Sequence, residues 1–167
     1  MRIINAAHDM RTIGRLLTQA EAEARRGGEE TPGPQHLLLA STALPDGTAL
    51  RALERVGVDA QQLRNAIEAA HEGALATVGV NLERSGRSES ALRGPARGVL
   101  RSTPQAQRVF QDALALSKST KPSLLRGAHF VAAACSLERG TLVRALAALG
   151  IDRDDLRAAA CAEVGID

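Results

Sequence analysis

The clearest pattern in the chain is an apolar residue at every third or fourth position, the spacing that marks one face of an α-helix. In the first predicted helix these residues are Ile13, Leu16, Leu17, Ala20 and Ala24. Two glycines, Gly27 and Gly28, then predict its end. A second segment, from about Gln35 to Leu44, is apolar nearly all round, which is typical of a helix enclosed by its neighbours.

Two further helices are predicted after this apolar segment, and their apolar positions are Leu50, Leu53, Val56, Leu63 and Ile67. Gly57 predicts the end of the earlier one, because glycine is common just beyond the last helical residue. Asp59 is then expected to cap the later one. Gln62 stands at the third helical position after it, as in a capping box.

The same order of features returns 93 residues later along the chain. Shifting the sequence by this distance aligns the segment beginning at His36 with the one beginning at His129, and the match continues without a gap as far as Ala69 and Ala162. Identical pairs include Ala40/Ala133, Gly47/Gly140, Thr48/Thr141, Arg51/Arg144, Leu53/Leu146, Gly57/Gly150, Asp59/Asp152 and Leu63/Leu156. So ordered a match predicts two copies of one helical unit.

The sequence therefore predicts an all-α fold of two tandem pseudo-symmetric four-helix repeats, with about eight helices in a single domain spanning 1–167. The first repeat is expected at about 5–72 and the second at about 102–164. Between them, residues 79–101 are rich in Gly, Ser and Arg, which is typical of a flexible linker.

Composition supports helices and limits the classes of partner. The chain has 167 residues, of which 44% are hydrophobic, and Phe110 and Phe130 are its only aromatic residues. Lys plus Arg exceed Asp plus Glu by only 21 to 19, so no nucleic-acid partner is expected. The interspersed charges indicate a solvated helix face; they are Glu21, Glu23, Arg25, Arg26, Glu29 and Glu30. Because the start lacks an apolar segment of signal-peptide length, we expect a cytoplasmic protein with no membrane partner.

No motif for catalysis, metal binding or a cofactor is found, so the chain is predicted not to be an enzyme. It has no phosphate-binding loop, no H-E-x-x-H pair and no nucleophile elbow. Cys135 and Cys161 lack the C-x-x-C spacing and are interpreted as buried small hydrophobes, although a disulfide between them stays open. A His129/Cys135 pair is six residues apart, on different faces of one helix. Arg51 and Arg144 are interpreted as surface or helix-end partners.

Two segments resemble a known family. Glu23-Ala-Arg-Arg, followed after nine residues by His36-Leu-Leu-Leu-Ala, resembles the Clp N-terminal repeat, and Ser102-Thr103-Pro104 through Val109 is similar to the opening of its companion repeat. The resemblance implies the domain that receives adaptors and protein substrates for ClpA- and ClpC-type AAA+ unfoldases. Because the chain ends at Asp167 without AAA+ modules, a stand-alone member is expected.

The resemblance also implies where binding occurs, at the residues that open the second helix of each repeat. The candidate binding residues are Pro34, Gln35, His36, Gly127, Ala128 and His129. Some ClpC relatives hold phosphorylated arginine with a Thr-Glu pair just before each histidine. Here that pair is replaced by Pro34-Gln35 and Gly127-Ala128, so we expect phosphoarginine recognition to be lost or weakened. Both histidines are otherwise interpreted as satisfied structural residues.

Three functional hypotheses follow, in order of preference. The first is a non-enzymatic protein-binding or peptide-binding module that modulates a Clp protease system, with a partner segment in a groove between the two repeats near their second helices. Its partner would be a Clp ATPase, a protease subunit, an adaptor or a client. The second is a protein that sequesters a small apolar molecule or cyclic peptide in an aliphatic cleft, and the third is an enzyme.

Overall fold

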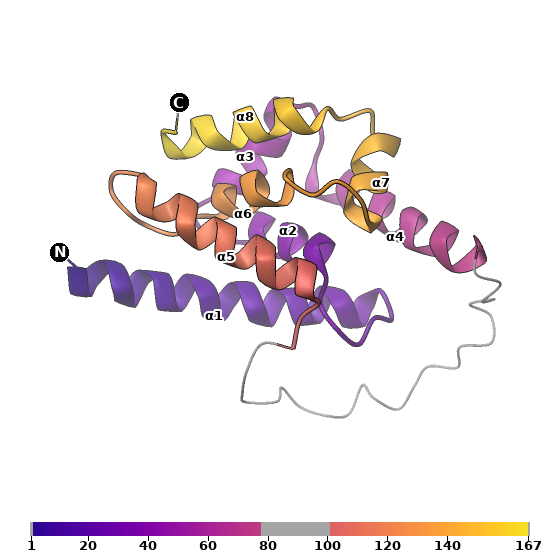
Figure 1. Ribbon diagram of the computed structural model, residues 1–167, viewed down its shortest axis with the longest axis horizontal. Coiled ribbons are helices and arrows are strands. Elements are labelled where there is room, and N and C mark those ends of the chain that lie inside the picture. Colours follow the sequence, from indigo (N-terminus) through magenta and orange to yellow (C-terminus); the bar gives the residue numbers. More distant parts are fainter. Residues whose placement is uncertain (1, 78–100, 167) are drawn as a thin grey trace.

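The computed structural model describes residues 2–77 and 101–166, and the chain in these two ranges forms eight helices and no strand. The first half contains α1 (Arg2–Arg26), α2 (Pro34–Thr42), α3 (Thr48–Arg55) and α4 (Ala60–Thr77). The second half contains α5 (Pro104–Ser119), α6 (Gly127–Ala134), α7 (Thr141–Ala148) and α8 (Arg153–Val164). The predicted all-α class is confirmed (Figure 1). The predicted linker lies outside the described residues, apart from Arg101.

The helix boundaries repeat at the predicted offset. The starts of α2 and α6, of α3 and α7, and of α4 and α8 are each 93 residues apart, as are the ends of α1 and α5. The first helix differs at its other end, where Arg2–Met10 precede the part that corresponds to α5. The two halves therefore share the same order and spacing of helices.

Short-range caps explain why the helices begin and end at these positions. The backbone N–H of Gln62 donates to Asp59 Oδ1 at 2.8 Å, and the Gln62 side chain accepts from the Asp59 N–H at 2.9 Å, which confirms the predicted capping box. Asp152 caps α8 by accepting from the N–H groups of Asp154 and Asp155. Gly57 has φ +78°, a left-handed conformation that ends α3 at low steric cost.

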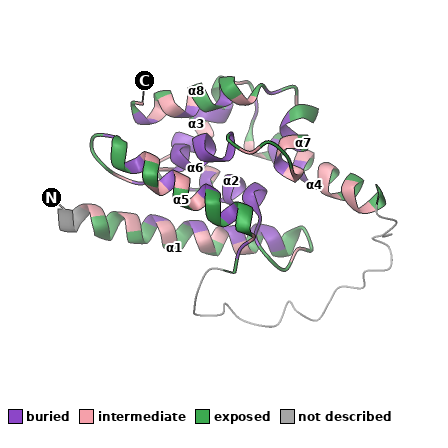
Figure 2. Cartoon of the chain, viewed as in Figure 1, coloured by how far each residue is buried: buried purple, intermediate pink, exposed green. Residues whose placement is uncertain are grey.

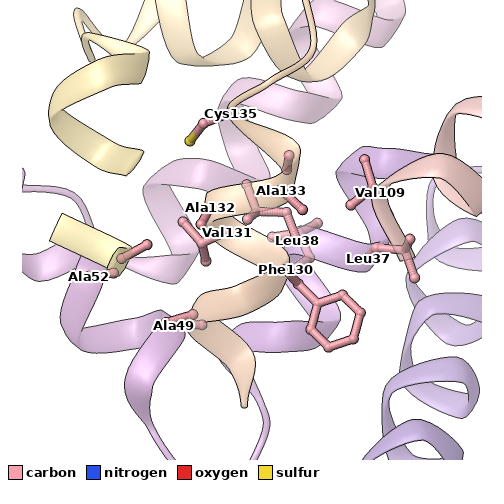
Figure 3. Close-up of a cluster of buried hydrophobic side chains, with 14 of the residues drawn as sticks. Leu37, Leu38, Ala49, Ala52, Val109, Phe130, Val131, Ala132, Ala133 and Cys135 are labelled. Atoms are coloured by element: carbon pink, nitrogen blue, oxygen red, sulfur yellow. The ribbon is translucent and has the colours of Figure 1, made fainter. Parts of the chain in front are cut away.

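The core is centred on α2 and α6, as the burial colouring shows (Figure 2). Pro34–Ser41 of α2 and all of α6 are buried, which confirms that the apolar segment is an enclosed helix. The predicted end of this helix at Leu44 is wrong, because α2 ends at Thr42. Leu44 precedes Pro45, and a residue before proline is disfavoured in the helical conformation. Figure 3 shows Leu37, Leu38, Phe130 and Val131 among the core side chains.

The two halves interlock rather than form separate bundles. The fourth helix of each half packs on the third helix of the other half, α4 on α7 and α8 on α3. Two arginines of α3, Arg51 and Arg55, each bring Nε within 2.7 Å of the carboxylate of Glu163 in α8. Arg51 is thus a surface partner, as predicted. Arg144, its counterpart in α7, reaches Thr141 within its own helix.

Candidate binding pocket

The six candidate binding residues open α2 and α6, and all are buried: Pro34, Gln35, His36, Gly127, Ala128 and His129. Each histidine caps the start of its helix from within. Its Nδ1 accepts a hydrogen bond from the backbone N–H three residues earlier, that of Gly33 at 2.9 Å and that of Arg126 at 3.0 Å. The interpretation as a satisfied structural residue therefore holds for His36, whereas in His129 only Nδ1 has a partner. A binding role for the six residues stays a prediction.

The two triplets lie at opposite ends of α2. A Cβ added to Gly127 would lie 2.8 Å from the carbonyl oxygen of Ser41, in the last turn of α2, whereas Pro34 begins that helix about 10 Å away at 1.5 Å per residue. The N–H groups of Gly127 and Ala128 already donate to the side chains of Asp46 and Thr48 in the first half. α2 and α6 are both largely buried, and a docking groove between the repeats beside them stays a prediction.

One hollow does lie between the halves, at the junction of α3 and α8. It has a volume of about 610 Å³ and is lined by Arg55 and Val56 from the first half and by Ile151, Asp155 and Ala159, among others, from the second. None of the six candidate binding residues lines this hollow.

A second pocket, about 350 Å³ in volume, lies within the first half, between the end of α1, the loop after it, α2 and α4. His36 is the candidate residue that lines it. Its other ionisable lining residues are Glu23, Arg26, Glu29, Arg64, Glu68, His71 and Glu72. Leu39 and Ile67 add an apolar part of the lining. We call this the first-half pocket.

Glu23 anchors one side of the first-half pocket. Its side chain is only 2% exposed, and both carboxylate oxygens accept from Arg64, at 2.8 and 3.3 Å. Burial alone would raise the pKa of Glu23, but the hydrogen bonds from Arg64 and Gln19 and the charges of Arg64 and Arg26 lower it. The prediction that Glu23 belongs to a solvated helix face is therefore wrong, because Arg64 of α4 covers it.

Glu29 occupies the other side, held by two residues of α2 and one of α4. Its carboxylate lies 3.4 Å from His36 Nε2 and 3.4 Å from His71 Nδ1, and it accepts from the Gln35 amide at 3.3 Å. Burial raises the pKa of this carboxyl, but the hydrogen bond from His36 and the two imidazoles outweigh it, so the pKa lies below its ordinary value. Gln35 thus supports Glu29 from beside the pocket.

The corresponding positions of the second half carry apolar side chains. At the offset of 93, the counterparts of Glu23, Glu29, Glu68 and His71 are Leu116, Pro122, Cys161 and Val164. His129 Nε2, the counterpart of the His36 atom that meets Glu29, is buried and has no hydrogen-bond partner. Burial accordingly lowers the pKa of His129. The second half therefore keeps the histidine that caps the helix, and it has apolar side chains at the four positions that carry Glu23, Glu29, Glu68 and His71 in the first half.

The buried cysteine, Cys135, offers no activated thiol. Both cysteines are free; Cys135 is buried, whereas Cys161 is half-buried, so the prediction of two buried cysteines is wrong for Cys161. Burial raises the pKa of Cys135 to about 12, which keeps it a thiol at neutral pH. Within 2–77 and 101–166, no three His, Cys, Asp or Glu side chains are placed to hold a metal ion. Nor is any helix of these ranges long and apolar enough to cross a membrane.

Sequence reasoning missed seven of the eight ionisable pocket residues, namely Glu23, Arg26, Glu29, Arg64, Glu68, His71 and Glu72. They lie on two segments about forty residues apart in sequence, with no motif to join them. A partial signal was present in the repeat, since Glu23, Glu29 and Glu68 each face an apolar residue of the other copy. The same is true of Glu54 and Arg55 outside the pocket, so this signal alone does not locate it.

The described helices define a class of protein, an all-helical domain built from two interlocked repeats. The family model of the Clp repeat (R) N-terminal domain matches residues 11–93. The fold is also similar to the crystal structure of the N-terminal domain of the caseinolytic protease associated chaperone ClpD from Arabidopsis thaliana, with a TM-score of 0.59, 19% sequence identity and 90% of each chain covered.

The chain belongs to the Clp N-terminal domain family. Domains of this family dock substrates and adaptors in Clp unfoldases and are not themselves catalytic. At 19% identity, the likeness to the ClpD domain shows the fold alone. Among curated proteins, none gives a significant match to the chain.

Proposed function

We propose that this chain is a non-enzymatic protein-binding module that docks a component of a Clp protease system and modulates it. The component is a Clp ATPase, a protease subunit, an adaptor or a client, and the setting is the cytoplasm. Family membership supports binding of a protein partner in general. The observation that carries the proposal for this chain is the first-half pocket, which is open, polar and built by groups from α1, α2 and α4.

The pocket favours a protein segment over an apolar small molecule. Of its lining residues, Leu39 and Ile67 are apolar and eight are ionisable. An apolar ligand would have to strip water from these charged groups without replacing their hydrogen bonds, which is costly. A peptide side chain with a polar end satisfies them. The proposal of an apolar-ligand sequestering protein therefore has no specific support in this pocket.

The test uses purified proteins in defined pairs. The chain is immobilised, and the Clp ATPase, protease subunit and adaptor from the same cell are each passed over it at concentrations up to about 100 µM, near the weak end of specific recognition. We expect one of them to bind in a saturable way, and its ATPase or proteolysis rate to change when the chain is added. An absence of binding by all three and by a client protein of the same protease, or turnover of a substrate by the chain alone, would contradict the proposal.

A matched pair of variants locates the binding surface in the same experiment. Glu68→Gln/Glu72→Gln changes two exposed residues of the first-half pocket, and Glu54→Gln/Glu138→Gln changes two exposed glutamates outside it. Both double variants remove the same formal charge. If the pocket docks the partner, the first should weaken binding and the second should leave it unchanged.

A further inference from the structure

The charges around the first-half pocket do not balance. With the histidines counted as neutral, four glutamates face two arginines. Both arginines are already paired with Glu23, Arg64 through two contacts and Arg26 at 3.5 Å. The remaining carboxylates, those of Glu29, Glu68 and Glu72, therefore give the pocket a net negative charge.

Glu29 is reachable and is held in place without an arginine or lysine contact. Its side chain is 22% exposed, and its three partners are the imidazoles of His36 and His71 and the amide of Gln35. These groups fix the carboxylate by hydrogen bonds, so its orientation does not depend on an incoming ligand. A pre-oriented carboxylate loses little entropy when it binds a cation.

The lining also has an apolar part. Leu39 is 3% exposed and Ile67 is 4% exposed, and both line the pocket beside the carboxylates. A lysine or arginine side chain combines an aliphatic stem with a cationic end, which matches an apolar wall next to acidic groups. A volume of about 350 Å³ is within the range of sites that enclose a small group.

We infer that the first-half pocket receives a lysine or arginine side chain of the docked partner. The stem lies against Leu39 and Ile67, and the cationic end reaches Glu29, Glu68 and Glu72. This inference rests on the proposed function, because it assumes that the occupant belongs to a protein. The second half offers no equivalent subsite, since Pro122, Cys161 and Val164 stand where Glu29, Glu68 and His71 stand in the first.

The experiment uses blocked pentapeptides with one variable side chain, Ac-Ala-Ala-Xaa-Ala-Ala-NH2, where Xaa is lysine, arginine, norleucine or glutamate. Each is titrated into the full chain while NMR signals of the Leu39 and Ile67 methyl groups and the His71 ring are followed. The lysine and arginine peptides should shift these signals in a saturable way. Norleucine, which keeps the stem without the charge, should bind at least fivefold more weakly, and glutamate should not bind.

Variants test whether the carboxylates carry the selectivity. Glu68→Gln/Glu72→Gln should weaken binding of the lysine peptide about fivefold, the effect of removing exposed ion pairs, whereas Glu54→Gln/Glu138→Gln should leave it unchanged. Binding of the lysine peptide should also weaken as salt is raised from about 0.05 to 0.5 M, because exposed charges are screened.

Several outcomes would overturn the inference: equal binding of the norleucine and lysine peptides, shifts confined to other parts of the chain, or no effect of the pocket variant. Binding of n-butylammonium as tightly as the lysine peptide would also overturn it, because the site would then recognise a free amine. The two proposals fail separately. A Clp component that binds while no peptide does leaves the module function standing, and peptide binding without any Clp partner removes that function but not the subsite.

Discussion

His36 and His129 occupy the same position of the same helix cap, but their second ring nitrogens meet different surroundings. In the first half, Nε2 of His36 lies 3.4 Å from Glu29 beside an open polar pocket. In the second half, Nε2 of His129 is enclosed without a partner. The shared nitrogen, Nδ1, holds the backbone in both. The repeat therefore preserves the contact that builds the helix cap, while the second ring nitrogen meets a carboxylate in one copy and has no polar partner in the other.

The largest effect is expected from removing the two histidines. His129→Ala should lower the free energy of unfolding by about 2–4 kcal/mol, because it opens a cavity in a fully buried site and leaves the Arg126 N–H without its acceptor. His36→Ala should cost less, about 1–2 kcal/mol, because water in the pocket can replace part of the lost contacts. Urea unfolding measures both. Equal losses would contradict the contrast between an open and an enclosed site.

A methyl group at the start of α6 should come next. Gly127→Ala places a Cβ 2.8 Å from the Ser41 carbonyl oxygen and 2.9 Å from the Ala49 Cβ, and such overpacking costs about 1–3 kcal/mol. The control is Gly73→Ala in α4, where nothing lies within 4 Å. That change should stabilise the chain by about 0.5–1 kcal/mol, as alanine does in a helix. A neutral Gly127→Ala in thermal unfolding would show that α6 is less tightly enclosed than described.

A smaller effect is expected at the ion pairs between the halves. Arg51→Ala removes one of the two guanidinium groups on Glu163 and should cost about 0.5–1 kcal/mol, since Arg51 is half exposed and such pairs are weak. Arg144→Ala, at the same position of the other repeat, should change stability by less than about 0.5 kcal/mol. Chemical denaturation of the two variants compares their free energies of unfolding. Equal losses would contradict the expectation that the arginine of α3 stabilises the junction more than its counterpart in α7.

The smallest effect on stability at neutral pH is expected from the protonation of His129, Glu23 and Glu29. The folded-state pKa of His129 is lowered by burial, so its contribution is complete above the ordinary histidine value of about 6.5 and is lost as the pH falls below it. The pKa values of Glu23 and Glu29 are also lowered. Their contribution is present above the ordinary glutamate value of about 4.3 and is lost at lower pH.

Urea midpoints between about pH 7.5 and 3.5 should therefore fall in two stages. His129→Gln should flatten the first stage, whereas His8→Gln, a change at an exposed residue, should keep it. Glu23→Gln should reduce the second stage and leave the part that Glu29 contributes. A first stage that persists in His129→Gln would assign it to a different group.

Much of the fold was predictable because it depends on local signals. The caps at Asp59 and Asp152 act within three residues, and the offset of 93 transfers each element of one half to the other. The pocket was not predictable in this way. Glu29 and His71 are 3.4 Å apart in space but forty-two residues apart in sequence, and their meeting depends on how α4 packs. Nor could the identity of His36 and His129 in the alignment reveal that their Nε2 atoms have different surroundings.

Asp46 and Thr48, which supply the acceptors for the first N–H groups of α6, belong to the other half of the chain. Residues of the first repeat thus cap the first turn of a helix in the second repeat. Exchanging halves between relatives, or trimming the chain to a minimal unit, would separate a helix from its initiator. A successful chimera must therefore transfer the Asp46-to-Thr48 loop together with α6, and natural change in either segment should constrain the other.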